Sequence, residues 1–590
     1  MDIEELSLIG IAALIAVVAV AMLASRINVA APLILVVLGI GIGYIPGVPL
    51  ISIDPEIILL GVLPPLLYAA AVNVPVLDLR RDLGPISALS VVLVIISAIA
   101  IGALLHLVVP AIPFAAAVAL GAVVAPTDAV AATSIGKRVG MPPRLVTILE
   151  GESLVNDATS LVLLRTAIAA VAGGFVFWEA AATFAFAVVV AIIIGLLVGA
   201  ITVWVRSKLS NPIHDTVVSF TVPFIAFVPT EYLGASGVLA VVVTGLYSGH
   251  HAPHKFSATA RVNERLNWRT AQFLLENGVF LLMGLELHKL VDDVARSDVH
   301  LSRTLLLALG VVVVLILLRM AFMWPVTWAL ARALPRAEAR AAGMRRLAKR
   351  VEAHPRSSAP TDTQAMRLRR FDRMVRRTAA DAAHARDQGL DWRGATILGW
   401  SGMRGVVTLA AAQSIPTSVP YRSQLVLIAF LVAVATLLLH GLTLPGMIRK
   451  LRPSGPSAGD RSQELTALAS DLAEAGESAL DAAIEHDREL AEADPAHPVP
   501  SETVIDRARS NVRGSVASMA FALPQSPDAE RTPAEDEARA QLRLARIVLD
   551  AQRATLLEER AVGQYSSEAL RAAEAALDAH ELRLTPPSKH

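Results

Sequence analysis

The chain contains Gly151-Glu152-Ser153-Leu154-Val155-Asn156-Asp157 in the middle of an otherwise apolar span, Leu145 to Ala172. Ionisable groups at membrane depth are costly, so they usually face a water-filled cavity and mark an ion or proton pathway. On a helix, Ser153 and Asp157 lie one turn apart. Glu152 and Asn156 are also one turn apart, so the four side chains form two adjacent rows. We expect one row to bind a cation and the other to hold the first in place. The alternative, an acidic first turn of a soluble helix, is disfavoured by the rest of the chain.

The composition indicates a membrane protein. Of 590 residues, 54% are hydrophobic and only 18% are charged, whereas a soluble domain carries about a quarter of charged residues. The chain has no cysteine, which excludes disulfides, thiol catalysis and thiolate metal sites. Lys plus Arg and Asp plus Glu are both 52, so the overall charge points to no particular partner, nucleic acid included.

The apolar runs and the positions of the basic residues predict about 13 transmembrane helices. A span needs roughly 20 apolar residues, and the candidates lie near 6–24, 29–45, 56–72, 86–109, 111–135, 145–172, 178–205, 213–229, 233–249, 269–288, 301–333, 393–416 and 422–447. With the N-terminus outside, Lys and Arg concentrate in the cytoplasmic loops and are nearly absent from the facing loops. This asymmetry predicts an outside N-terminus and a cytoplasmic C-terminus.

Two polar regions are expected on the cytoplasmic side of a membrane domain that covers residues 1–450. Residues 334–390 hold 14 Lys/Arg against 6 Asp/Glu, which suits either anionic headgroups or a solvated loop. Residues 451–590 hold 15 Lys/Arg against 25 Asp/Glu. Helical patterns at 463–493 and 533–583 predict a small helical domain there. Pro-containing pieces around 494–500 and 523–533 separate these patterns. Regulation, oligomerisation and solubilisation remain open as its role.

Two of the spans carry residues that break a helix. Pro126 removes a backbone donor just before Thr127 and Asp128, which frees oxygen ligands at mid-membrane. Three glycines, Gly399, Gly402 and Gly405, surround Arg404 in the twelfth span. The two breaks fall at equivalent places of two six-helix units joined by a linker span, which predicts inverted repeats with crossed discontinuous helices. Ordinary kinks are the alternative.

These residues resemble the monovalent cation:proton antiporter family, which includes the NhaP-like and NHE-like sodium/proton exchangers. The resemblance covers about residues 6–447. Its motifs are Leu63-Pro64-Pro65-Leu66-Leu67-Tyr68, Ala125-Pro126-Thr127-Asp128, Glu150-Gly151-Glu152-Ser153-Leu154-Val155-Asn156-Asp157-Ala158 and Gly402-Met403-Arg404-Gly405. It implies a secondary antiporter of the cell membrane that serves pH homeostasis, is a homodimer and needs no cofactor.

The resemblance also implies roles for single residues. Asp157 is the expected carrier of cation or proton, with Ser153 and Thr127 as further Na+ ligands. Glu152 and Asn156 are the pair expected to steady this site, and Glu152 is expected to contact the cation through water. Asp128 and Arg404 resemble a charge pair at the crossed helices. Arg319 matches an arginine that pairs with the acid at Glu152.

Two features distinguish this chain from relatives. Asn156 stands where electrogenic relatives carry a second acid, so one-for-one, electroneutral exchange is expected. Many relatives have an acid soon after the Leu-Pro-Pro motif, whereas Ala69, Ala70 and Ala71 follow Tyr68 here. The detailed ligand geometry and the choice of ion are therefore open.

Elementary chemistry supports Na+/H+ or Li+/H+ exchange and leaves K+/H+ exchange open. Burial disfavours the charged form of a carboxylate, so proton and cation compete for Asp157, and alternating access turns this competition into antiport. No Gly-rich phosphate loop is present. A channel or a sensor is a weaker hypothesis, and an enzyme is the weakest.

Arg165 receives no role. Glu276, Asn277 and Glu286 are minor path candidates. His250, His251 and His254 are more consistent with a solvated loop than with pH sensing.

Overall fold

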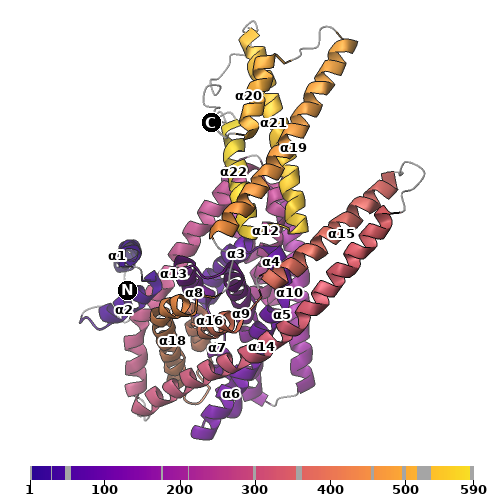
Figure 1. The fold of residues 1–590 in the computed structure, drawn as a ribbon. Coiled ribbons are helices and arrows are strands. Elements are labelled where there is room, and N and C mark those ends of the chain that lie inside the picture. The colour runs from indigo at the N-terminus through magenta and orange to yellow at the C-terminus, as the bar shows by residue number, and fades with distance from the viewer. Residues whose placement is uncertain are drawn as a thin grey trace. The chain divides into compact units, whose positions relative to one another are not determined.

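The computed structural model describes residues 3–584 except 28, 47–54, 174–176, 210, 297–300, 354–361, 388, 454–457, 495–499 and 514–532. Every regular element in this part of the chain is a helix (Figure 1). The first elements are α1(Ile3–Ile27), α2(Ala31–Gly43), η1(Ile57–Val62), α3(Leu63–Asn73), α4(Val76–Arg81), α5(Leu83–Ser87), η2(Ala88–Val92), α6(Leu93–Val108), α7(Phe114–Val124), α8(Ala129–Arg138), α9(Pro143–Gly173) and α10(Phe177–Arg206). They are followed by α11(Pro212–Tyr232), α12(Gly237–Lys255), α13(Ala258–Ala295), α14(Leu301–Glu352), α15(Asp362–Asp387), α16(Trp392–Trp400), α17(Val406–Gln413), α18(Arg422–Leu451), α19(Ala458–Ala493), α20(Glu502–Arg513), α21(Pro533–Val562) and α22(Ser567–Leu584).

The helices confirm the prediction of an all-α, polytopic membrane protein. Within the described residues, seven helical stretches are long and apolar enough to cross a membrane, and three shorter apolar helices accompany them. Large apolar side chains stay exposed along them, such as Leu306 at 69% and Trp204 at 66%. Such a surface suits a lipid environment and not water. The number of thirteen crossings and the inverted repeats remain predictions.

Both predicted helix breaks are present. The chain is non-helical at 125–128, between α7 and α8, and again at 401–405, between α16 and α17. Local capping explains where the helices restart. The Asp128 carboxylate accepts a hydrogen bond of 2.8 Å from the Val130 amide at the start of α8. Asp391 caps α16 in the same way through the Gly394 amide, at 2.8 Å.

The helices group into two compact units. Unit 1 consists of Met1–Lys255, Asn263–Ala333 and Gln388–Gly455, and unit 2 of Phe256–Val262, Leu334–Asp387 and Pro456–His590. The basic segment 334–387 therefore groups with the acidic C-terminal region. The helix predicted over 301–333 continues without interruption to Glu352, because its Ala-, Arg- and Leu-rich continuation has high helix propensity.

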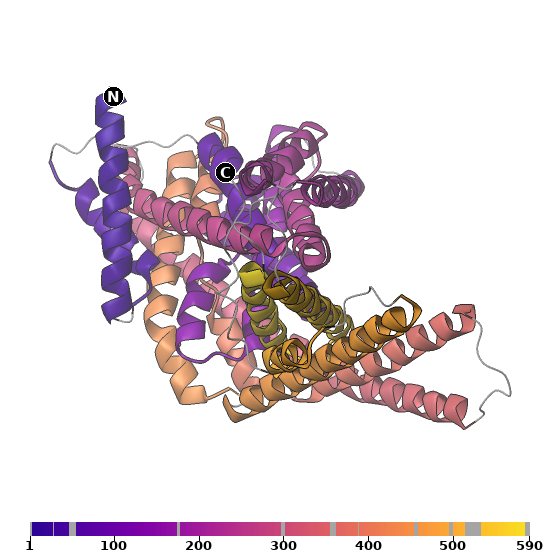
Figure 2. The same cartoon turned by 90° about the horizontal axis from the view of Figure 1, so that it is seen from above.

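Two hydrophobic clusters form the interior of unit 1. The first cluster combines buried residues of α1, α2, α6–α9, α14, α16–α18 and the later half of α13. The second cluster combines α3, α10, α11, α12 and Trp268. In Figure 2, α10–α12 gather on one side of this unit, whereas α1, α2 and α18 lie on the other. Helix α9 contributes to both clusters, with Leu164 and Ala167 in the first and Leu154 and Ala158 in the second.

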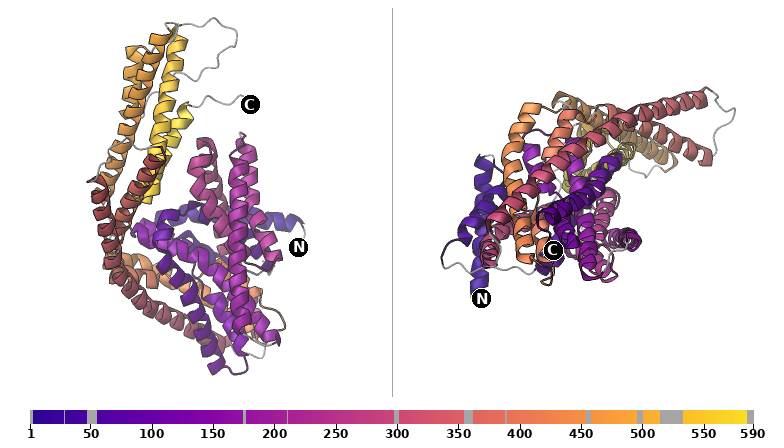
Figure 3. Two further views of the ribbon diagram at one scale, coloured as in Figure 1. Left: turned by 90° about the vertical axis from the view of Figure 1, so that its right-hand side faces the viewer. Right: turned by 90° about the horizontal axis from the view of Figure 1, so that it is seen from below.

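Unit 2 contains a bundle of the helices α19–α22 (Figure 3). Leu480 and Leu544 are fully buried in it. The structure divides the pattern predicted over 533–583 into α21 and α22, because Gly563 has a φ of 73° and ends the first helix. Helix α20 was not predicted. The Pro-containing pieces around 494–500 and 523–533 lie mostly outside the described residues.

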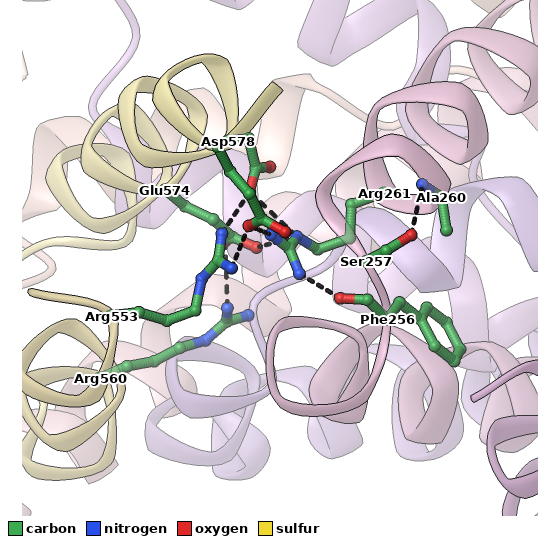
Figure 4. A network of polar contacts seen from close by, with 9 residues as sticks. Phe256, Ser257, Ala260, Arg261, Arg553, Arg560, Glu574 and Asp578 are labelled. Atoms are coloured by element: carbon green, nitrogen blue, oxygen red, sulfur yellow. Dashed lines mark hydrogen bonds and ion pairs between the residues drawn. The ribbon is translucent and has the colours of Figure 1, made fainter. Parts of the chain in front are cut away.

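A buried ion-pair network ties the segment Phe256–Val262 to α21 and α22 within unit 2 (Figure 4). Arg261, with 4% of its side chain exposed, donates to Asp578, which is 1% exposed. Arg553 donates to the same carboxylate at 3.0 Å, and Arg560 donates to Glu574 at 3.2 Å. Without Asp578, Arg261 keeps only the more distant carboxylates of Glu574 and Glu581, at 3.9 and 3.7 Å, so its buried charge is poorly compensated.

Asp578→Asn is expected to loosen this attachment by about 3 kcal/mol, because Arg261 and Arg553 lose their shared carboxylate. Trypsin cleavage of the 451–590 region in the full chain should then be faster by roughly two orders of magnitude, since cleavage follows the population of opened molecules. Asp481→Asn is the control: it removes the exposed Arg509–Asp481 pair and should not change the rate. Equal rates for the two variants would contradict the assignment.

Candidate functional site

The two helix breaks cross each other and are joined directly. The Asp128 amide donates a hydrogen bond of 2.8 Å to the Met403 carbonyl. A Cβ atom at Gly405 would lie 2.2 Å from Asp128 Oδ2, so only glycine permits this approach. The crossing brings the C-terminal ends of α7 and α16 close to the N-terminal ends of α8 and α17. Opposite helix-dipole charges therefore meet at one place.

Arg404 neutralises the carbonyl ends at this crossing. Its Nε donates to the Val124 carbonyl at 3.0 Å, and its Nη1 donates to the Gly402 carbonyl. Although the resemblance implies a charge pair of Arg404 with Asp128, no ion pair joins the two side chains among the described residues. The physical reason is that each side chain serves a helix end: Asp128 caps the positive start of α8, and Arg404 faces the negative ends of α7 and α16.

A second network surrounds Glu152 on α9. The Glu152 carboxylate, 1% exposed, forms a bidentate ion pair with Arg319 of α14. Arg319 Nη2 donates to Glu152 Oε2 at 2.8 Å. Thr127 Oγ1 donates to Glu152 Oε1 at 2.8 Å. The Asn156 amide in turn donates to the Thr127 carbonyl at 3.0 Å and to its hydroxyl at 3.2 Å. The broken segment is thereby fixed to α9.

Asp157 has no such partner. Its side chain is 8% exposed, and no hydrogen bond or ion pair to it is found among the described residues. Ser153, one turn earlier, is half-buried on the same row. A carboxylate withdrawn from water and left without a donor is unfavourable as an anion unless a proton or a cation joins it. The arrangement can therefore bind either. No group of three or more His, Asp or Glu side chains fit for a resident metal occurs in the described part of the chain.

Two of the three alanines that follow the Leu-Pro-Pro motif and Tyr68 lie in close packing. Ala69 and Ala71 are fully buried. A Cβ atom at Gly245 of α12 would lie 2.7 Å from the Ala71 Cβ, and one at Gly249 would lie 2.3 Å from the Val72 carbonyl oxygen. Helices α3 and α12 thus approach too closely to admit a carboxylate at Ala71.

Comparison with known proteins now identifies the family. A family model described as "Sodium/hydrogen exchanger, transmembrane" matches residues 12–450. The chain belongs to the sodium/hydrogen exchanger family.

An uncharacterized Na+/H+ exchanger of Mycobacterium bovis is 30% identical over 454 residues, 75% of this chain and 74% of that protein. A sodium, potassium, lithium and rubidium/H+ antiporter of Bacillus pumilus is 31% identical over 301 residues, 50% of this chain and 45% of that protein. The sodium proton antiporter MjNhaP1 of Methanocaldococcus jannaschii has a similar fold, with a TM-score of 0.54 at 16% identity, covering 76% of this chain and 98% of that one.

A further buried charge network surrounds Arg206 in this exchanger. Arg206 comes directly after the span predicted over 178–205, yet its side chain is fully buried. Its Nε donates to Asp215 at 2.7 Å, and Nη1 donates to Glu264. These partners lie 9 and 58 residues away in the sequence, so periodicity alone does not reveal them.

The residues considered as minor candidates for the ion path form contacts of their own in separate places of the exchanger. The Glu276 carboxylate accepts a hydrogen bond from Gln272 at 2.6 Å, one turn earlier on α13. Glu286, near the end of the same helix, accepts from Gln413. His251 stacks on Tyr247 at 4.1 Å. None of these bonds involves Asp157. Arg165 forms an ion pair with Glu231 of α11, which no pattern in the sequence indicates.

Arg319→Gln is expected to destabilise the exchanger by about 3–5 kcal/mol, because Glu152 is left as a buried charge without its partner. The double variant Glu152→Gln/Arg319→Gln should recover most of that loss, since no charge then remains unpaired. The stability of both variants is measured as the temperature at which half of the detergent-solubilised protein has lost its monodispersity. A double variant as unstable as the single one would contradict the account.

Gly405→Ala is expected to displace Asp128 and to separate the two crossed segments, because the added methyl has no room. The same measurement should show a clear loss of thermal stability. Gly278→Ala is the matched control on α13, where a Cβ atom meets nothing within 4 Å; it should have no effect or stabilise slightly. If both changes had the same effect, close approach at Gly405 would not matter.

Proposed function

We propose that this exchanger moves Na+ or Li+ against H+ by competition of cation and proton for Asp157. The observation that carries the proposal is a carboxylate, 8% exposed, that receives no hydrogen bond from the described residues and lies beside an acid that Arg319 already neutralises. Asp157 is therefore the one acid on this stretch of α9 whose charge needs an external partner. Na+ prefers oxygen ligands, which the Asp157 carboxylate, the Ser153 hydroxyl and the Thr127 oxygens supply.

Only one carrier charge is present in the proposed cycle. Asn156 is neutral and its amide is engaged with Thr127, and the Glu152 charge is compensated by Arg319. One proton therefore replaces one monovalent cation, and the exchange is electroneutral. The unoccupied, charged site must not cross the membrane, because desolvation of a lone carboxylate is costly. This condition couples the two fluxes.

The proposal includes an orientation in the cell membrane. The N-terminus is outside, and the segment 334–387 and the 451–590 region are cytoplasmic, as the distribution of Lys and Arg predicts. Helix α9 then begins on the cytoplasmic side and ends outside. Alternating access follows from movement of the first hydrophobic cluster against the second, because α9 lies where they meet.

K+/H+ exchange is the second candidate. The Bacillus pumilus relative is named for transport of sodium, potassium, lithium and rubidium. The same oxygen ligands bind K+ when the cavity is slightly wider, so the mechanism would be unchanged and only the substrate would differ.

The test is cation-evoked proton flux in proteoliposomes under Na+, Li+ and K+, with wild type and Asp157→Asn compared. We expect wild type to show proton flux with Na+ or Li+ and Asp157→Asn to show at least a hundred-fold less. The flux through wild type should not respond to an imposed membrane potential. The Asp481→Asn variant, changed at an exposed tail position, is the control and should match wild type.

Other outcomes are equally decisive. Flux with K+ alone would keep the mechanism and change the substrate. A response to membrane potential would contradict the one-for-one stoichiometry. Flux that survives Asp157→Asn would exclude this residue as the carrier and favour a channel or a sensor.

A further inference from the structure

The face of α9 that carries Asp157 lies on the boundary between the two hydrophobic clusters of unit 1. Leu154 and Ala158 on this face belong to the second cluster, and Leu161 packs against both. Arg165 continues the same row, four residues beyond Leu161. It lies about 12 Å along the helix axis from Asp157, at about 1.5 Å per residue.

Arg165 is tied across this boundary to the second cluster. Its Nη2 donates to Glu231 Oε2 near the end of α11. Glu231 is itself held firmly, because its Oε1 accepts a hydrogen bond of 2.9 Å from the Gly237 amide at the start of α12. A Cβ atom at Gly237 would lie 2.8 Å from the Glu231 Cγ, so the carboxylate has little freedom. One end of the pair belongs to the helix of the ion site, and the other belongs to α11 and α12.

A cavity of about 330 Å³ lies beside this ion pair. Helix α9 lines it with Val162, Arg165 and Thr166, helix α10 with Glu179 and Thr183, and the turn before α12 with Gly234 and Ala235. Arg165, which lines the cavity, has 54% of its side chain exposed. At about 30 Å³ per water molecule, it has room for a monovalent cation with its first hydration shell. Hydroxyls and the Glu179 carboxylate suit such an ion.

We propose that this cavity is the outer vestibule of the exchange path and that the Arg165–Glu231 pair is the latch between it and Asp157. The proposal rests on the proposed function and its orientation, which place the end of α9 outside. While the pair is formed, the clusters stay together on the outer side of Asp157. The site opens to the vestibule only when they separate there, which breaks the pair.

The chain has no cysteine, which permits a direct test of the latch. Arg165→Cys/Glu231→Cys is joined with a short bifunctional methanethiosulfonate, and cation-evoked proton flux is measured before linking, after linking and after reduction. We expect linking to slow exchange at least ten-fold and reduction to restore it. Flux that is unchanged by linking would overturn the latch.

Thr216→Cys/Asn267→Cys is the matched control. These side chains also touch, at 3.3 Å between Nδ2 and Oγ1, but they join α11 to the early part of α13. Trp268, the neighbour of Asn267, belongs to the second cluster, as α11 does. The same reagent should leave flux through this variant at its unlinked value. If it slowed this variant as much, linking would report general stiffening and the latch would be refuted.

The vestibule has an independent test that needs no transport. Thr183→Cys in intact cells should react with a membrane-impermeant maleimide added outside, whereas Ile193→Cys, 58% exposed on the apolar surface of the same helix, should not. Labelling of Thr183→Cys only after the cells are opened would overturn the outer vestibule. Because labelling does not depend on exchange, a wild type without cation-evoked flux would refute the proposed function separately.

Discussion

Within the described part of the chain, an arginine neutralises one of two buried acids on α9, and no donor reaches the other. Arg319 and Glu152 satisfy each other, Thr127 donates to Glu152, and Asn156 in turn donates to Thr127. The cost of burying these charges is recovered only while the network is complete. Its consequence reaches beyond stability, because the network holds the broken segment at Thr127 against the helix that carries Asp157. In the proposed mechanism, this unsatisfied carboxylate in otherwise satisfied surroundings is where the ion binds.

The crossed helix breaks supply the surroundings that make this site possible. Asp128 caps the start of α8, and Arg404 binds the carbonyl ends of α7 and α16, so the exposed backbone dipoles are compensated without the Asp157 charge. The two hydrophobic clusters then give α9 two different neighbours. In the proposed mechanism, movement of one cluster against the other alters the access to Asp157 while the ligands stay together. The Arg165–Glu231 pair lies on that boundary, in the right place to limit the movement.

Much of this arrangement was predictable from the sequence. Pro126 and the glycines around Arg404 predict the two helix breaks, and the resemblance implies the ion pair of Glu152 with Arg319. The partners of Arg404 were not predictable, because backbone carbonyls have no signal in the sequence and the nearest visible acid, Asp128, suggested an ion pair. The burial of Arg206 was missed because its position at a span end also fits a cytoplasmic loop. The close packing of Ala71 against Gly245 was not predictable, because only the structure shows which helix lies opposite. The partner of Arg165 was not predictable either, because Glu231 on α11 lies 66 residues away in the sequence.

The central claim is that proton and cation occupy the same carboxylate in turn. The most direct measurement is proton release from purified, weakly buffered protein when Na+ is added, or the cation that the flux assay selects, together with calorimetric binding in buffers of different ionisation enthalpy. The account predicts that each bound cation displaces up to one proton and never more, and that Asp157→Asn abolishes both binding and release. Cation binding without proton release at every pH would contradict it.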